Sequence, residues 1–312
     1  MRTDLLQSRL CRCPGHWAIF LLLGLQRAVV FWHTIGMVDT PKRKRRWLQY
    51  RLRTLLALML LTGIGMGWVT VRMRAANKQH QTVQAIREAG GEAYFIEGRP
   101  RAVWLQALAG KAKVWAVSFS HATNTISDLE VQHVEQLTDL QHLLLGGTQI
   151  TDVGLQHIER LTELEVLYLD HTQITDAGLE HIHDLPRLRF VDLQGTRVSG
   201  SGFRHFKGLS NLQVLILDGT GVTDAALPFL KALPRLQDLS LKNTQVTDAG
   251  LPYLKDLPTL QTVRLSGTKI TDAGLRHLEK ASHLFKVEVD NTNVTEEGAR
   301  SLERQLPGGI VL

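Results

Sequence analysis

The chain has 312 residues, 44% of them apolar, so it is long enough and apolar enough to bury a sizeable core. Its net charge of +6 is uneven: residues 1–72 hold 12 Lys and Arg against 2 Asp and Glu, and residues 73–312 hold 24 against 28. The basic residues therefore lie beside an apolar stretch, which favours a membrane over a nucleic acid as their partner. Both cysteines, Cys11 and Cys13, lie near the N-terminus, so a fold formed by the rest of the chain needs no disulfide and offers no thiol nucleophile.

The first 36 residues contain an apolar run that Gln26 and Arg27 interrupt, and its unbroken part is too short to cross a hydrocarbon core of about 30 Å. Met37 begins a stretch that reads as a coherent start of a bacterial membrane protein. We expect residues 1–36 to be an over-extended start or a disordered segment, with Met37 as the true first residue. A first, poor transmembrane helix is the alternative.

Residues 54–71 contain no charge and predict a transmembrane helix, at the short end of the spanning range. Seven Lys and Arg residues lie before it within the basic segment 37–53, and three follow it within 72–78. This imbalance predicts a cytoplasmic N-terminus and a periplasmic or extracytoplasmic location for the rest of the chain. A cleaved signal peptide is a weaker alternative, because small residues are poorly placed for cleavage.

Residues 72–112 are predicted to form a helical stalk and an N-terminal cap. The helix-permissive stretch 73–89 ends at Gly90-Gly91, residues 92–96 read as a strand, and residues 102–109 read as a short helix. A solenoid must cover the end of its core with an element outside the repeat. We assign residues 90–112 to that role.

Residues 113–312 repeat with a period of 24 residues. One degenerate unit occupies 114–136, and seven regular units begin at 137, 161, 185, 209, 233, 257 and 281. Apolar residues at positions 7 and 9 of each unit predict a short buried strand, and those at positions 19 and 22 predict a short helix on the opposite wall. This period predicts an α/β solenoid in the form of a right-handed horseshoe, with a parallel sheet on its concave side and short helices on its convex side.

Three polar positions recur in the units and are interpreted as scaffold. Thr at position 12 ends the strand and can satisfy backbone groups of the turn. The Thr-Asp pair at positions 15 and 16 supplies helix N-cap oxygens and a negative charge at the helix start. Gly at position 18 removes a side chain where the helix and the neighbouring unit approach closely.

The unit L-x-x-L-x-x-L-x-L-x-x-T-x-I/V-T-D-x-G-L resembles the leucine-rich repeat, in particular the ribonuclease-inhibitor-like and F-box-associated types. Together with RRWLQYRLRTLLALMLL and AIREAGGEAYF, it resembles the membrane-anchored leucine-rich repeat proteins of planctomycete-type bacteria. The resemblance implies a protein-interaction scaffold without catalytic residues. It implies no role in protein degradation, because neither an F-box segment nor a ubiquitin-ligase domain is present in the sequence.

Positions 6, 8 and 10 are predicted to point away from the core, onto the concave face. There an apolar patch bordered by aspartates in the first units, and basic residues further on, are the usual marks of an interface. The alternative is that a concave face is simply more apolar than a convex one. The predicted partner-binding residues are Leu144, Val166, Tyr168, Asp170, Phe190, Asp192, Val214, Ile216, Asp218, Lys242 and Arg264.

Histidines recur at position 21, where stacking would bring their rings together. A metal ladder or a pH-sensitive stripe is conceivable, but a half-buried polar-aromatic ridge is the favoured interpretation. These histidines are His133, His157, His181, His205 and His277. No phosphate-binding, dinucleotide-binding, zinc-protease or hydrolase motif occurs, so we expect no catalytic, cofactor or metal site.

We therefore expect a membrane-anchored, non-enzymatic scaffold that binds a protein or peptide and no nucleic acid. Two alternatives remain open: a structural component of the cell envelope without a dedicated ligand, and a scaffold whose repeats lie on the cytoplasmic side. An enzymatic role survives only if a separate catalytic subunit is recruited.

Overall fold

The structure is a computed structural model that describes residues 42–95, 113–119, 126–279, 281, 283–306 and 310–311. The expectations for residues 1–36 and for a helix at 102–109 lie outside the described residues. The chain separates into two compact units, residues 1–68 and Val69–Leu312.

Helix α2 runs without a break from Lys42 to Glu88 and so continues through the predicted boundaries at 53 and 71. Before residue 69 its described apolar side chains are exposed to solvent, as Leu61 and Ile64 illustrate. Among the residues that the structure describes, no helix combines the length and the apolar character that a membrane crossing requires. The expected transmembrane helix at 54–71 therefore gains no support from the structure.

The C-terminal end of α2 covers the first edge of the repeat core. Val83 and Ile86 are buried in that core, and the Thr82 hydroxyl donates to Gln136 Oε1 at 3.1 Å. The helix ends just before Gly90, whose φ of +89° suits glycine. This helix end and the strand that follows it close one end of the solenoid.

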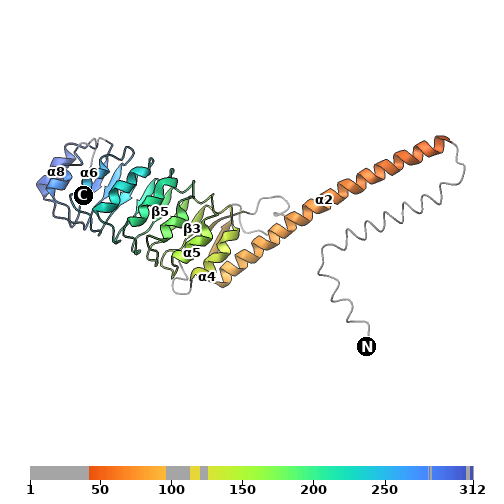
Figure 1. The fold of residues 1–312 in the computed structure, drawn as a ribbon, viewed down its shortest axis with the longest axis horizontal. Helices are drawn as coiled ribbons and strands as arrows, with labels where there is room; N and C mark the ends of the chain where they lie inside the picture. Colours follow the sequence, from red (N-terminus) through yellow and green to blue (C-terminus); the bar gives the residue numbers. More distant parts are fainter. Residues whose placement is uncertain are drawn as a thin grey trace, which may run out of the picture. The chain divides into compact units, whose positions relative to one another are not determined.

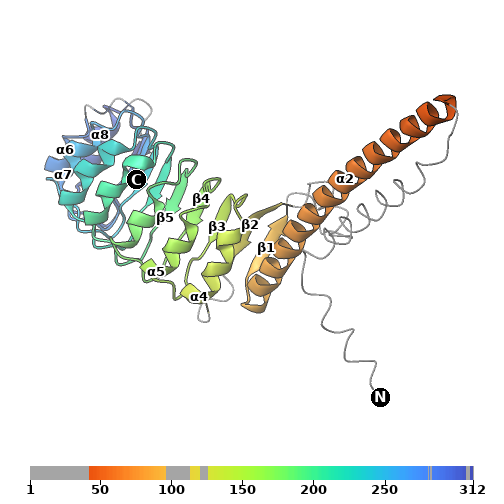
Figure 2. The ribbon, with the colours of Figure 1, turned by 45° about the vertical axis from the view of Figure 1, so that its right-hand side comes forward.

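The strands form a single ten-stranded sheet in chain order, β1 to β10 (Figures 1 and 2). β1 pairs antiparallel with β2, and every later pair is parallel, including the short final strand. The strands are β1 Glu92–Phe95, β2 Val114–Ser118, β3 His142–Leu144, β4 Val166–Tyr168, β5 Phe190–Asp192, β6 Val214–Ile216, β7 Asp238–Ser240, β8 Thr262–Arg264, β9 Lys286–Glu288 and β10 Ile310–Val311.

Short helices lie along one side of this sheet (Figure 1), some of them α-helical and some 3-10 helices. They are α4 Asp128–Val131, η1 Gln132–Gln136, α5 Asp152–Leu155, η2 Gln156–Ile158, η3 Gly178–Ile182, η4 Ser201–Gly208, η5 Asp224–Ala232, α6 Leu251–Leu254, α7 Asp272–Leu275 and α8 Glu296–Glu303. The predicted arrangement of a parallel sheet with short helices is confirmed.

One continuous core runs through all the units. The residues predicted to point inward from each strand are buried, for example Leu167 and Leu169, and the helix residues Leu179 and Ile182 meet them. The position-12 hydroxyl satisfies the turn as predicted: Thr172 Oγ1 donates to the Leu169 carbonyl at 2.6 Å, and the other regular units repeat this bond.

The Thr-Asp pair joins neighbouring units rather than serving one helix alone. Thr175 Oγ1 accepts a bond from its own helix start, as an N-cap does, but the aspartate accepts from the following unit. Asp152 accepts the backbone N–H of Thr175 at 2.8 Å and its hydroxyl at 2.6 Å. The same pair of bonds links Asp128 to Thr151, Asp224 to Thr247, Asp248 to Thr271 and Asp272 to Thr295.

Candidate functional site

The predicted binding residues lie on or directly after strands β3 to β8, on the sheet face that points away from the core. We call this the open sheet face; it carries positions 6, 8 and 10 of each unit. Strand register sets its neighbours: Val166, Phe190 and Val214 lie side by side on successive strands, as do Tyr168, Asp192 and Ile216.

An apolar cluster occupies β4 to β6. We call it the β4–β6 patch, and its members are Val166, Tyr168, Phe190, Val214 and Ile216. The rings of Tyr168 and Phe190 are 4.7 Å apart between centroids, with their planes tilted by 38°. The sequence predicts an exposed patch, but all five side chains are half-buried. Strands about 4.8 Å apart let neighbouring side chains cover one another.

The apolar surface continues toward the first unit through Leu144, His142 and Trp115. The Trp115 ring meets the His142 ring edge-on, with centroids 4.8 Å apart. Burial lowers the pKa of His142, against the opposing effect of Glu165, and so favours the neutral imidazole. Trp115 is not among the binding residues predicted from the sequence. Its unit departs from the regular repeat, so the pattern does not indicate the direction of its side chain.

Three aspartates border the β4–β6 patch: Asp170, Asp192 and Asp218, here called the acidic triad. Asp192 was expected on an exposed surface, but only 8% of it is accessible, because it lies between Tyr168 and Ile216. Its Oδ1 accepts the N–H of Gln194 at 2.9 Å. Burial raises the pKa of Asp192, the hydrogen bond from Gln194 opposes this, and the two neighbouring carboxylates raise the pKa further.

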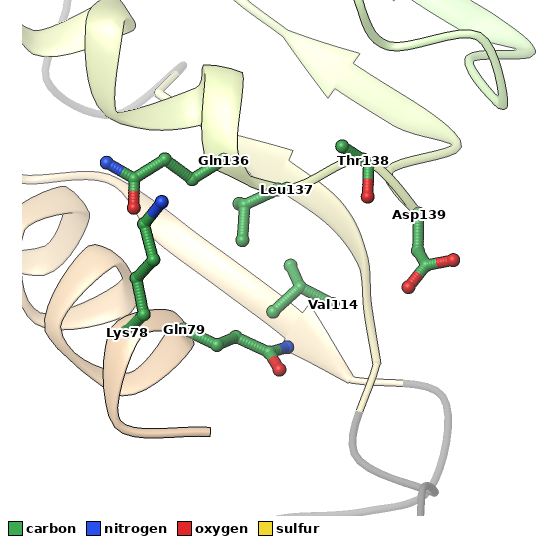
Figure 3. Close-up of a pocket in the computed structure, with 7 residues that line it drawn as sticks. All are labelled: Lys78, Gln79, Val114, Gln136, Leu137, Thr138 and Asp139. Atoms are coloured by element: carbon green, nitrogen blue, oxygen red, sulfur yellow. The ribbon is translucent and has the colours of Figure 1, made fainter. Parts of the chain in front are cut away.

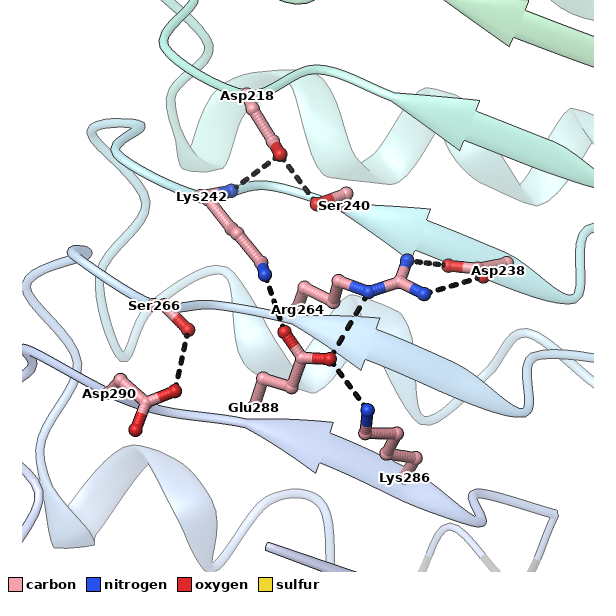
Figure 4. Close-up of polar contacts among 9 residues, drawn as sticks. All are labelled: Asp218, Asp238, Ser240, Lys242, Arg264, Ser266, Lys286, Glu288 and Asp290. Carbon is pink, nitrogen blue, oxygen red and sulfur yellow. Dashed lines mark hydrogen bonds and ion pairs between the residues drawn. The ribbon is translucent and has the colours of Figure 1, made fainter. Parts of the chain in front are cut away.

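The far half of the open sheet face compensates its own charges (Figure 4). The Arg264 guanidinium holds both oxygens of Asp238, and Arg264 Nε lies 3.3 Å from Glu288. Lys242 and Lys286 approach the same Glu288 carboxylate at 2.6 and 2.8 Å. Lys242 and Arg264, predicted as part of a basic binding surface, are thus held in ion pairs within the chain.

The Glu288 carboxylate is the centre of this network. Burial by itself would raise its pKa, but the hydrogen bonds and charges of Lys242 and Lys286 prevail and lower the pKa from 4.5 to about 2. Asp218 lies at the border between the two halves: it accepts the Ser240 hydroxyl at 2.5 Å and the Lys242 backbone N–H at 2.9 Å.

A small pocket of about 220 Å³ lies away from the predicted surface, where α2 meets the first units (Figure 3). Its polar groups come from α2, from the last residue of η1 and from the loop before β3, and Asp139 is paired with Lys113 at 2.8 Å. The lining residues are Lys78, Gln79, Val114, Gln136, Leu137, Thr138 and Asp139. They do not assemble a nucleophile with a base.

Two of the five recurring histidines, His157 and His181, contact carboxylates of the preceding unit. His181 Nδ1 lies 2.6 Å from Glu159, and His157 Nδ1 lies 3.6 Å from Glu135. Within the described ranges, no three His, Cys, Asp or Glu side chains are grouped so as to hold a metal ion.

Comparison with known proteins identifies the repeat. Two family models described as leucine-rich repeats match residues 138–198 and 256–278. No curated protein matches the chain. Internalin C2 from Listeria monocytogenes is similar in structure, with a TM-score of 0.52 and 29% identity over 66% of this chain and 82% of that chain.

Two further solved structures are similar at lower identity. A second internalin from Listeria monocytogenes has a TM-score of 0.49 and 18% identity, over 66% of this chain and 63% of its own. A leucine-rich repeat protein from Leptospira interrogans has a TM-score of 0.48 and 19% identity, over 67% of this chain and 50% of its own.

Leucine-rich repeat solenoids generally act as non-enzymatic scaffolds that bind proteins or peptides on an extended face. The two family matches, the likeness to internalin C2 and the 24-residue units of strand, turn and short helix all agree. Residues 138–198 and 256–278 of the chain are leucine-rich repeats, and the repeat region has the fold of a leucine-rich repeat solenoid.

Proposed function

We propose that this protein is a non-enzymatic scaffold that binds another protein or a peptide through the β4–β6 patch of its open sheet face. The observation that carries the proposal is the contacting pair Tyr168 and Phe190, half-buried among aliphatic side chains. Aromatic side chains set among apolar ones and rimmed by charge are the usual centres of protein interfaces.

The contrast between the two halves of the open sheet face supports this location. From β7 to β9 the charged side chains bind one another, so a ligand there has to displace ion pairs already made. From β4 to β6 an incoming side chain meets apolar surface. Binding there removes that surface from water, at about 25 cal/mol for each Å².

A pair of double variants tests the proposal. We expect Tyr168→Ala with Phe190→Ala to abolish partner labelling when the full chain carries a proximity-labelling enzyme in its native cell. The matched control is Phe229→Ala with Tyr253→Ala, two exposed aromatics on the helix side, which should leave the labelled set unchanged. Equal labelling by both variants would instead favour an envelope component without a dedicated ligand.

We further propose that residues 54–71 anchor the chain as a single span, with the N-terminus cytoplasmic and the repeats extracytoplasmic. The support is in the sequence: 18 uncharged residues, the basic flank at 42–53, and the resemblance to membrane-anchored leucine-rich repeat proteins of planctomycete-type bacteria.

Fractionation tests this attachment and its sidedness. The full chain should stay in the membrane pellet through an alkaline carbonate wash, and protease added to intact spheroplasts should digest the repeats. Release by carbonate would rule out the anchor. Repeats that survive the protease would place them on the cytoplasmic side.

A further inference from the structure

We propose that the partner segment is cationic, with an Arg or Lys side chain that enters between the Tyr168–Phe190 pair and the acidic triad, and apolar residues on either side of it. This inference rests on the proposed function and names the chemistry of the ligand at the same surface.

The charge balance of the open sheet face is the first step. Its second half pairs Asp238 and Glu288 with three cations of the chain. In its first half, none of the ion pairs formed among the described residues includes a member of the acidic triad. Like charges on adjacent strands destabilise a sheet. The acidic triad therefore lowers the stability of the fold, as residues of binding sites often do.

The burial of Asp192 is the second step. Only 8% of the residue is accessible, it lies on the middle one of three adjacent strands, and the only bond that its carboxylate accepts from a described residue is the Gln194 N–H. A buried carboxylate with one hydrogen bond and two anionic neighbours is costly, and an opposite charge close by offsets that cost. A cation brought by a partner supplies that charge.

The cations of the chain itself are committed elsewhere. The side chains of Lys242 and Arg264, the basic residues of the neighbouring strands, reach toward Glu288 and Asp238, and the Lys242 ammonium group points away from Asp218 (Figure 4). His171 attracts the Asp192 carboxylate and so lowers its pKa, but its Nε2 lies 3.3 Å from Gln194 Nε2 and it forms no ion pair with Asp192. Among the described residues, no lysine or arginine forms an ion pair with the acidic triad, and a cation on a ligand can supply that charge.

The neighbouring aromatics favour a side-chain cation over other ligands. A guanidinium or ammonium group gains by stacking on an aromatic face and by pairing with a carboxylate at the same time. Phosphate groups of a nucleic acid are repelled by three carboxylates. The apolar residues on both sides, Val166 and Val214 among them, suit apolar neighbours of the cation in an extended peptide.

The experiment selects random twelve-residue peptides, displayed on phage, against the immobilised full chain. We expect Arg and Lys to be enriched about twofold or more over the unselected library. For synthetic copies measured by fluorescence anisotropy, affinity should fall about tenfold or more when the peptide Arg becomes citrulline, or when the protein carries Asp170→Asn with Asp192→Asn. Asp184→Asn with Asp256→Asn, two exposed carboxylates elsewhere, is the matched control and should change nothing.

If the double variant melts at a lower temperature than the wild type, Asp170→Asn alone is the variant to use. Asp170 is half-exposed and Asn is nearly isosteric with Asp, so this change should leave the fold intact. Peptides whose affinity falls in the Tyr168 and Phe190 variants but not in the carboxylate variants would overturn this inference and leave the proposed function standing. Peptides that are indifferent to both the aromatic and the acidic variants, or failure to select any peptide, would overturn both.

Discussion

At the scale of single residues, most position-18 glycines are explained by a carboxylate from the preceding unit, whereas a Cβ at Gly202 would meet the Asp176 backbone carbonyl. A Cβ at Gly274 would overlap Asp248 Oδ1, and the same holds for Gly154 with Asp128. The aspartate has to sit there because it accepts both the N–H and the hydroxyl of the threonine that follows. The glycine and the aspartate are thus two halves of one contact between units.

Gly274→Ala should therefore destabilise the protein by about 1–3 kcal/mol, and by clearly less when Asp248 is already Ala. Chemical denaturation of the four members of this double-mutant cycle measures the coupling. An equal cost of Gly274→Ala in both backgrounds would show that the carboxylate is not what excludes a side chain.

Glu288 makes stability depend on acid. Its pKa in the folded protein, about 2, is below the ordinary 4.5, so its contribution is complete above pH 4.5 and is lost as the pH falls toward 2. The loss over this window should be about 3 kcal/mol at most. Glu288→Gln should flatten this part of the curve of unfolding free energy against pH, whereas Glu297→Gln, an exposed control, should not. Parallel curves for the wild type and Glu288→Gln would exclude the network as the cause.

At the scale of elements, the contact between units departs from the regular pattern between η3 and η4, where Asp176 accepts bonds from Ser199 and Gly202, and it is lost between η4 and η5. Gly200 replaces the aspartate of position 16, and Ala226 replaces the glycine of position 18 in the next unit. The threonine that follows, Thr223, has no side-chain cap bond of the regular kind. The two substitutions belong together, because the absence of the carboxylate leaves the space that the Ala226 methyl group fills.

This pairing predicts a non-additive pair of variants. Gly200→Asp alone should destabilise the protein by about 2–3 kcal/mol, because a Cβ there meets Ala226 and φ is +103°. Adding Ala226→Gly should recover part of that loss, although Ala226→Gly by itself removes a buried methyl group. Thermal melting of Gly200→Asp, Ala226→Gly and the double variant measures these differences in stability. A double variant less stable than Gly200→Asp would contradict the pairing.

At the scale of the whole molecule, the stacked units form one continuous sheet face whose two halves differ in polarity and charge. Residues 24 apart in the chain become neighbours on adjacent strands, so each strand contributes one element to a continuous surface. The first half of that surface is apolar and acidic, and the second is charged and internally neutral. A partner is expected to bind at the first half and to be oriented by the boundary near Asp218.

Much of this architecture was predictable from the sequence. A fixed period of 24 residues leaves only stacking as a way to bury Leu167 and Leu169, so the sheet, the helices and the members of the open face all followed from position in the unit. The double role of the Thr-Asp pair was only half predicted, because an N-cap is local whereas the bond from Asp152 to Thr175 joins units.

What the sequence alone determined is the period, and with it the fold and the identity of the residues that share a face. The tertiary structure alone decided which of those residues are available to a partner. Lys242 and Arg264 look like free cations in the sequence and are bound to Glu288 and Asp238 in the fold, while Asp192 looks exposed and is covered by Tyr168 and Ile216. The physical reason is that burial and pairing depend on side chains from adjacent units, and on their conformations, neither of which a single repeat specifies.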